Sequence, residues 1–187
     1  MARLEPSQVR LSEQVSVARY RKFVEDQDRA ALAAFIRDRF RERYLRPITS
    51  RGKHGFTMMS VACLMIETLE AFSQGWPNTR DKSFKAFKAF FNRHNSFADF
   101  RPIARRFWED IRCGLLHQGE ARGGWRIRRV GPLIDTASRI LNATRFVNAL
   151  AGTLEDYAKS LETEPWAAPV WTKFLRKMDA VCESSLG

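Results

Sequence analysis

The sequence has few cysteines and no long apolar run. Its three cysteines, Cys63, Cys113 and Cys182, are widely spaced and never form a C-x-x-C pair. This pattern predicts neither a disulfide framework nor a zinc site and is typical of a reducing compartment. The apolar run from Val61 to Ile66 is far shorter than the roughly 20 residues that span a bilayer. We expect no membrane association, no metal and no other cofactor.

Targeting and linker signals are absent as well. Charges at Arg3, Glu5 and Arg10 leave no apolar stretch at the amino terminus, so no secretory signal is predicted and a cytoplasmic protein is expected. The sequence shows no repeat, low-complexity tract or inter-domain linker. At 187 residues the chain is expected to form a single domain.

Acidic residues are scarce relative to basic ones. The 21 Asp and Glu against 32 Lys and Arg give a formal net charge of +11, which attracts RNA, DNA or an anionic membrane surface alike. The excess lies in two regions, residues 1–53 and 101–130. For the second region we favour binding, whereas the first is as typical of a solvated surface. The first is densest at Arg39, Arg41, Arg43, Arg46, Arg51 and Lys53.

Helical periodicity runs through most of the chain, and strand signals are nearly absent. The predicted fold class is all-α, a helical bundle with a short β-arm near 122–129, where Trp125 to Arg128 alternates. The expected helices are Ser7–Leu45 as one long or two shorter helices, a buried Phe56–Ser73, a short helix from Thr79 or Asp81 to Phe91, Phe97–Gln118, a long helix from Pro132 or Asp135 to Leu161, and Val170–Cys182.

One segment, from Phe107 to Glu120, carries residues suited to chemistry. It holds Arg112 and His117 with four residues between them, at the end of an amphipathic helix. This arrangement resembles the R-x4-6-H signature of the HEPN superfamily. The resemblance covers residues 56–161, with 1–50 as a helical extension and 166–184 as a carboxy-terminal helix.

The resemblance implies RNA cleavage without a metal, with Arg112 and His117 as the catalytic pair, often in a homodimer. It suggests a role in toxin–antitoxin systems or phage defence, with an antitoxin or another protein as partner. Many relatives have a polar residue directly after the arginine, where this chain has Cys113. Some HEPN domains are non-catalytic modules that bind RNA or protein, which is the alternative function.

The side chains support the same chemistry independently of the family. RNA carries its own nucleophile, the 2′-hydroxyl, so a protein need only move a proton and stabilise charge on the phosphate. An imidazole titrates near neutral pH, which suits His117 to general acid and base catalysis. The planar guanidinium of Arg112 can hold two phosphate oxygens. DNA, which lacks the 2′-hydroxyl, should resist cleavage.

Regular helix geometry separates the two side chains. Five residues of α-helix place Arg112 and His117 about 140° apart, with Leu116 between them and opposite the buried stripe. We therefore predict a symmetric dimer with Leu116 at its interface, in which the arginine of one chain approaches the histidine of the other. A monomer would need the helix to distort around Gly114.

Structural roles compete with the catalytic ones. Arg112 could pair with Glu109 or stack on Trp108, and His117 could simply occupy a helix carboxy terminus. Cys113 could meet His117 and act as a thiolate nucleophile, although no orienting group can be named.

The apolar helix at Phe56–Ser73 contains Glu67 and Glu70. Either one of them is buried and paired with an arginine, for which Arg112 is a candidate, or both lie at the solvent-exposed edge of that helix.

Basic side chains that follow the motif are predicted to guide RNA. Trp125 either completes a stacking platform for single-stranded RNA or caps the core. The predicted guiding residues are Arg122, Arg126, Arg128 and Arg129.

Overall fold

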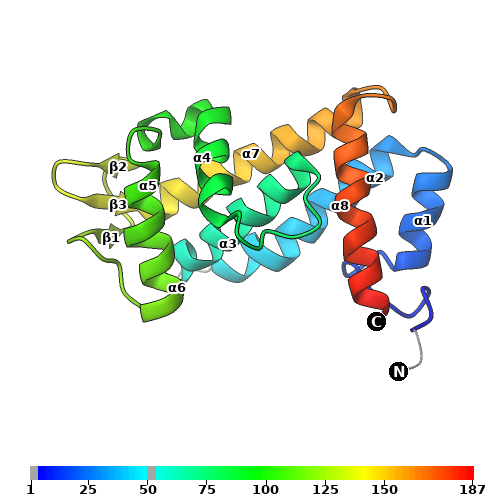
Figure 1. Ribbon diagram of the computed structural model, residues 1–187, viewed down its shortest axis with the longest axis horizontal. Coiled ribbons are helices and arrows are strands. Elements are labelled where there is room, and N and C mark those ends of the chain that lie inside the picture. The colour runs from blue at the N-terminus through cyan, green and yellow to red at the C-terminus, as the bar shows by residue number, and fades with distance from the viewer. Residues whose placement is uncertain (1–3, 50–53) are drawn as a thin grey trace. The chain divides into compact units, whose positions relative to one another are not determined.

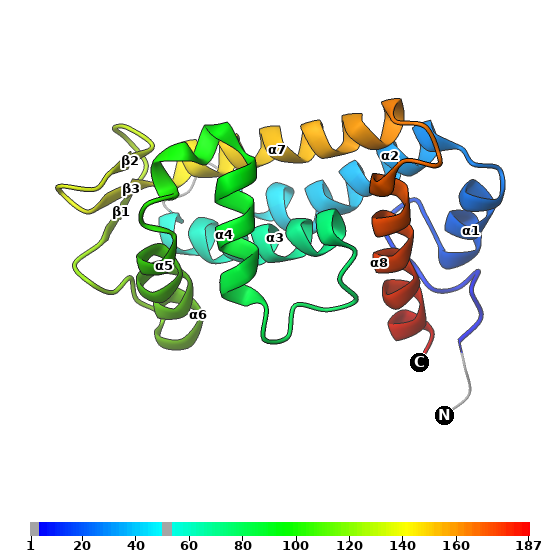
Figure 2. The same ribbon diagram turned by 45° about the horizontal axis from the view of Figure 1, so that its top comes forward.

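The computed structural model describes residues 4–49 and 54–187. This part of the chain is mostly helical and carries one small three-stranded sheet (Figures 1 and 2), so the prediction of a helical protein is confirmed at this level. The chain divides into two compact units. Unit 1 takes its described residues from Met1–Arg43, Ala71–Thr79 and Leu154–Gly187, and unit 2 from Tyr44–Glu70 and Arg80–Thr153.

Unit 1 contains α1 (Val17–Glu25), α2 (Arg29–Phe40) and α8 (Pro169–Leu186). The predicted amino-terminal helical segment is thus two shorter helices, because Ser16 and Asp28 each cap a new helix by accepting a hydrogen bond from a backbone N–H. Beyond α2 the chain continues through a π-turn, Arg41–Leu45, and a 3-10 turn, Arg46–Ile48. Tyr20 packs on Phe35 and Phe174 in the core of this unit.

The first basic region is largely engaged within unit 1. Arg39 is buried and donates to the carbonyl of Leu11, and Arg43 donates to the same carbonyl. Arg41 pairs with Glu155 at 2.8 Å. These partners indicate a structural role for the three arginines. Arg51 and Lys53 lie outside the described residues.

Unit 2 is built around a buried cluster of phenylalanines. It contains α4 (Ser83–Arg93), the 3-10 segment η3 (Asn95–Phe100) and the larger parts of two long helices, α3 (Gly55–Gln74) and α7 (Ala143–Thr163). Arg93 of α4 pairs with Glu70 of α3. The cluster comprises Phe87, Phe90, Phe91, Phe97, Phe100, Phe107 and Phe146, all fully buried.

The helix α3 confirms the predicted buried helix. By length and composition alone it could cross a membrane, but 61% of its most apolar window is buried inside the protein. It also carries Glu67 and Glu70, both of them buried. These properties are those of a buried core helix.

The predicted helix Phe97–Gln118 is a series of shorter segments. After η3 come a short α5 (Ala104–Phe107), the π-helix η4 (Trp108–Cys113) and α6 (Gly114–Gln118). Gly119 adopts a left-handed conformation and ends α6. The candidate site lies where η4 meets α6.

The prediction of a helix from Pro132 or Asp135 is wrong for its first turns. Residues 134–142 instead hold β2 (Ile134–Asp135) and β3 (Ile140–Asn142), and α7 begins at Ala143. Asp135 accepts from the backbone N–H of Ser138 and so closes a turn. The cap of α7 is Asn142, whose Oδ1 accepts from Arg145 N at 3.1 Å.

The predicted β-arm is confirmed as the strand β1 (Arg126–Arg128). It runs parallel to β3, which also pairs antiparallel with β2, giving the order β1-β3-β2. The strand is short, and its two arginines are exposed on either side of the half-buried Ile127.

Candidate functional site

Arg112 and His117 meet within a single chain. Arg112 Nη1 lies 3.1 Å from His117 Nε2. A guanidinium has only donors, so this contact is a hydrogen bond only in the tautomer that carries the ring hydrogen on Nδ1 and leaves Nε2 as the acceptor. His117 is exposed, and Arg112 is partly buried, with 16% of its side chain exposed.

Arg112 and His117 lie on either side of the end of the π-helix. A π-helix has hydrogen bonds to the fifth residue along and therefore more residues per turn than an α-helix. Arg112 lies inside η4 and His117 follows in α6. The expected separation of about 140° assumed a regular α-helix, and that premise is wrong here.

The π-helix ends next to Gly114, where the following loop folds back against the helix. A Cβ atom built on Gly114 would lie 2.4 Å from the carbonyl oxygen of Glu120 and 3.0 Å from Cγ of Arg122. The loop is held by a bond from Arg122 N to the carbonyl of Asp110 at 2.8 Å. Only glycine permits this close approach without displacing the loop.

A network of hydrogen bonds fixes the position of the Arg112 side chain. Its Nε donates to Glu67 Oε1 at 2.7 Å, and Ser83 Oγ donates to the same oxygen at 2.8 Å. Ser83 Oγ in turn accepts from Trp108 Nε1 at 2.8 Å. The network joins α3, α4 and η4, so the position of Arg112 is set by three elements.

The surroundings keep Arg112 charged. Burial acts to lower the pKa of Arg112, but hydrogen bonding and attraction to Glu67, with a smaller contribution from Cys113, outweigh it and raise that pKa. Cys113 therefore contributes a little to the raised pKa of Arg112. Burial also raises the pKa of the nearby Cys63 thiol, which leaves it as a neutral packing group.

These contacts decide between the structural alternatives. The prediction that a buried glutamate pairs with Arg112 is confirmed for Glu67. The alternative, that both glutamates lie at a solvent-exposed edge of the helix, is wrong because Glu70 is also buried and paired. Arg112 pairs with Glu67 and not with Glu109.

Arg105, seven residues earlier, makes both contacts that were considered for Arg112. It pairs with Glu109 at 2.6 Å and lies 5.4 Å from the ring centroid of Trp108.

Leu116 is half-buried in α6. The convergence of Arg112 and His117 in one chain removes the geometric reason for a dimer. The dimer, with Leu116 at its interface, stays a prediction.

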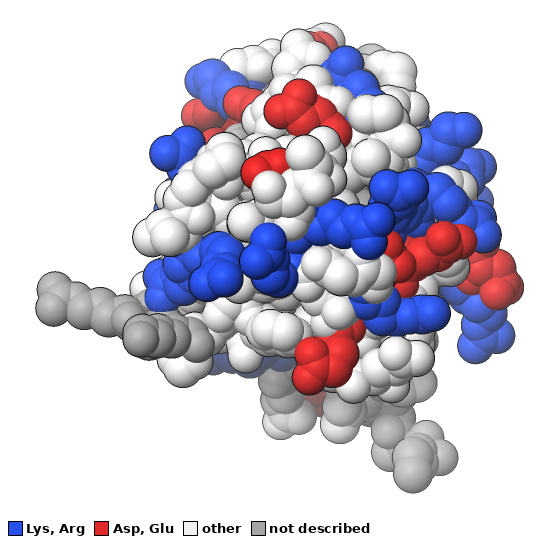
Figure 3. All heavy atoms as spheres, turned by 90° about the vertical axis from the view of Figure 1, so that its left-hand side faces the viewer, with Lys and Arg blue, Asp and Glu red and all other residues white. Residues whose placement is uncertain are grey.

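Basic side chains gather on the face of unit 2 that carries the strands. Figure 3 shows Lys and Arg forming a band across this face, with acidic side chains on either side of it. Of the predicted guiding residues, Arg122, Arg126 and Arg128 are exposed. Arg129 is half-buried and donates to Thr144.

The stacking role predicted for Trp125 requires a correction. Its side chain is only 5% exposed, so a base cannot stack on it, and it caps the core as the other interpretation predicted. Its neighbours at the sheet remain available to contact RNA.

Sequence reasoning missed Ser83 and the role of Trp108. Ser83 is the first residue of α4, and a serine in that position is ordinarily interpreted as a helix-capping residue. Nothing in the sequence links it to Glu67, which is sixteen residues away. Among the described residues, no group of three or more His, Cys, Asp or Glu side chains is placed to hold a metal ion.

Comparison with known proteins adds no relative. No family model, no curated protein and no solved structure matches this chain. Its function has to be argued from the site itself.

Proposed function

We propose that this chain is a HEPN-like endoribonuclease that cleaves single-stranded RNA without a metal ion. His117 is the general acid and base, and Arg112 stabilises the phosphate. The observation that carries the proposal is the 3.1 Å approach of Arg112 Nη1 to His117 Nε2. A permanently charged donor and an imidazole at this separation can engage one phosphodiester.

The reaction uses the nucleophile that RNA supplies. The 2′-oxygen bonds to phosphorus and the bond to the 5′-oxygen breaks, which leaves a 2′,3′-cyclic phosphate and a 5′-hydroxyl end. His117 Nε2 takes the proton of the 2′-hydroxyl, and the imidazolium returns it to the departing oxygen, directly or through water. The incoming phosphate replaces His117 as the partner of Arg112, whose guanidinium then holds the growing negative charge.

The anchoring of Arg112 favours catalysis because it reduces reorganisation during the reaction. Its Nε is held by Glu67, so the terminal nitrogens keep one orientation while they change partner. A donor fixed before the charge develops stabilises that charge more than a mobile one. The arrangement also keeps the guanidinium from folding away from the exposed His117.

One observation favours a second candidate, a non-catalytic module that binds RNA or a protein partner. The charge of Arg112 is already balanced by Glu67, and only 16% of its side chain is exposed. Cys113 also stands where relatives of the HEPN type often have a more polar residue. A role in toxin–antitoxin systems or phage defence follows from the resemblance alone and would suit either candidate.

The test is cleavage of an end-labelled single-stranded RNA in EDTA. We expect the wild-type protein to cut RNA and to leave DNA of the same sequence intact. His117→Ala should lower the rate by about 10²–10⁴-fold, and Arg112→Lys by about 10²-fold, since lysine cannot contact Glu67 and a phosphate together. His54→Ala, which removes an exposed histidine, should cleave like wild type.

The outcomes separate the two candidates. Intact RNA after incubation with a wild-type protein that binds it would support the non-catalytic module. Equal rates for wild type and His117→Ala would remove His117 from the mechanism.

A further inference from the structure

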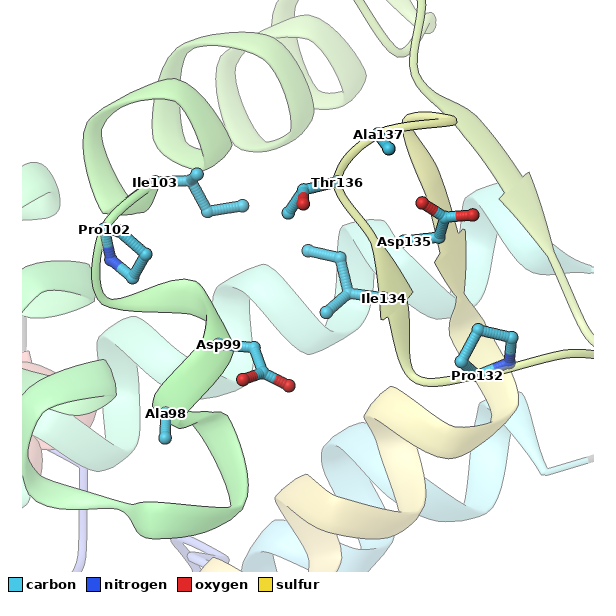
Figure 4. Close-up of a pocket in the computed structure, with 9 residues that line it drawn as sticks. All are labelled: Ala98, Asp99, Pro102, Ile103, Pro132, Ile134, Asp135, Thr136 and Ala137. Carbon is cyan, nitrogen blue, oxygen red and sulfur yellow. The ribbon is translucent and has the colours of Figure 1, made fainter.

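A cavity in unit 2 has no part in the cleavage chemistry proposed above. It measures about 600 Å³ and lies between the connection from η3 to α5 and the turn that includes β2 (Figure 4). Ile103 and Ile134 project into it from opposite sides, and Pro102 and Pro132 lie at its edges. A cavity of this volume is in the range that holds small molecules, and its apolar walls suit the faces of a flat ring.

Two carboxylates line the cavity, and one of them is already engaged. Asp135 Oδ1 accepts from Ser138 N at 3.0 Å. Hydrogen bonds from Ser138, together with a weaker attraction to Arg126, lower the pKa of Asp135. Its function is to hold the turn.

Asp99 is the free carboxylate. It is exposed and extends toward the open space of the cavity (Figure 4). Within the described part of the chain no hydrogen bond or ion pair engages it, so both of its oxygens can accept hydrogen bonds from a ligand.

The guanidinium of Arg126 lies beside the turn that Asp135 closes. Arg126 Nη2 donates to the carbonyl of Ser138 at 3.1 Å, and its charge acts on Asp135. Since residues 134–137 line the cavity, the guanidinium is within reach of a phosphate attached to a molecule bound there. The cavity therefore combines apolar walls, a free carboxylate and a neighbouring arginine.

We propose that this cavity binds a guanine base of single-stranded RNA, with Asp99 accepting from N1–H and the N2 amino group and Arg126 contacting the adjoining phosphate. The choice of guanine follows from the Watson–Crick edges. Guanine alone presents two neighbouring donors there, whereas adenine and cytosine place a ring acceptor beside the amino group and uracil has one N–H between two carbonyls. A carboxylate has only acceptors to offer.

The assignment to RNA rests on the proposed function and adds a base preference to it. Ile103 immediately precedes α5, and Arg112 lies nine residues further along the same helical stretch, about 13 Å at the usual rise per residue. A short single strand can reach from the cavity to the catalytic pair. Cleavage should therefore favour sites with guanine at a fixed offset from the broken bond.

Binding of mononucleotides tests the site without any cleavage. Isothermal titration of the full chain should show GMP binding at least about tenfold more tightly than AMP, CMP or UMP, because a hydrogen bond to a charged group is worth that much or more. IMP, which lacks the N2 amino group, should fall between. Asp99→Asn should abolish the preference while the unfolding midpoint stays unchanged, and Asp38→Asn, at an exposed position of α2, should keep it.

Equal affinity for the four nucleotides, or a GMP preference that survives in Asp99→Asn, would overturn the proposal. Its failure can be told apart from failure of the proposed function. Asp99-dependent GMP binding by a protein that cuts no RNA would uphold the cavity and reject the nuclease. Cleavage with no base preference, in a protein that binds GMP independently of Asp99, would uphold the nuclease and reject the cavity.

Discussion

Glu67 is the residue on which the candidate site depends most. It is 7% exposed, and its Oε1 accepts from both Arg112 and Ser83. Glu67→Gln would leave the partly buried guanidinium without a counter-charge. We expect the variant to lower the free energy of unfolding by ~1–3 kcal/mol, measured by chemical denaturation, and to slow RNA cleavage because Arg112 loses its anchor.

The matched control is Glu109→Gln, four residues after Arg105 on the same helical stretch. The Arg105 and Glu109 side chains are 64% and 47% exposed, and exposed pairs of this kind contribute roughly 0–1 kcal/mol. A loss for Glu109→Gln as large as that for Glu67→Gln would mean that burial does not distinguish the two pairs. Cleavage by Glu67→Gln at the wild-type rate would show that Arg112 needs no anchor.

At the scale of elements, the π-helix η4 carries Arg112, one member of the proposed catalytic pair. Its end is fixed by Gly114, where the carbonyl of Glu120 leaves no room for a Cβ atom. Gly114→Ala should destabilise the protein by ~1–3 kcal/mol, as overpacking does, and should lower cleavage by moving His117. Thermal unfolding and the RNA assay measure the two effects.

A second helical glycine provides the control. Gly152 lies in α7, and a Cβ atom there would meet nothing within 4 Å. Gly152→Ala should stabilise the protein by ~0.5–1 kcal/mol through the lower entropy of the unfolded chain. If both variants shifted stability in the same direction, the close contact at Gly114 would not be the cause.

The sequence predicted those elements whose pattern is local. The buried helix around Met65 and the strand at Ile127 follow from apolar content and alternation. The start of α7 was misplaced because Ile134 and Leu141, seven residues apart, fit a helical period by chance, although they pair across neighbouring strands. Strand β3 also pairs with β1, fourteen positions earlier in the sequence, and a periodic pattern does not encode such pairing.

The candidate site shows the same division. The sequence was sufficient to select Arg112, His117 and Glu67 by residue type. Their geometry was not predictable, because it depends on the π-helix and on the close packing of the loop on Gly114, which leave no local signature. The network through Ser83 is tertiary for the same reason.

For the whole molecule, the net charge of +11 is less informative than its distribution. In the first basic region, Arg39, Arg41 and Arg43 have partners within unit 1. In unit 2 the arginines of β1 are exposed, on a face where basic side chains form a band (Figure 3). We therefore expect the affinity for RNA to come from the second region and not from the total charge.

The salt dependence of RNA binding tests this distribution. Each phosphate neutralised on a single strand contributes about −0.7 to the slope of log affinity against log salt concentration. Arg126→Gln combined with Arg128→Gln should make the slope shallower by about 1.4. Lys22→Gln combined with Lys159→Gln removes the same charge from side chains of unit 1 that are 62% and 66% exposed, and should leave the slope as in wild type. Equal changes in both double variants would mean that RNA responds to the total charge, because only a localised contact distinguishes two surfaces that lose the same number of cations.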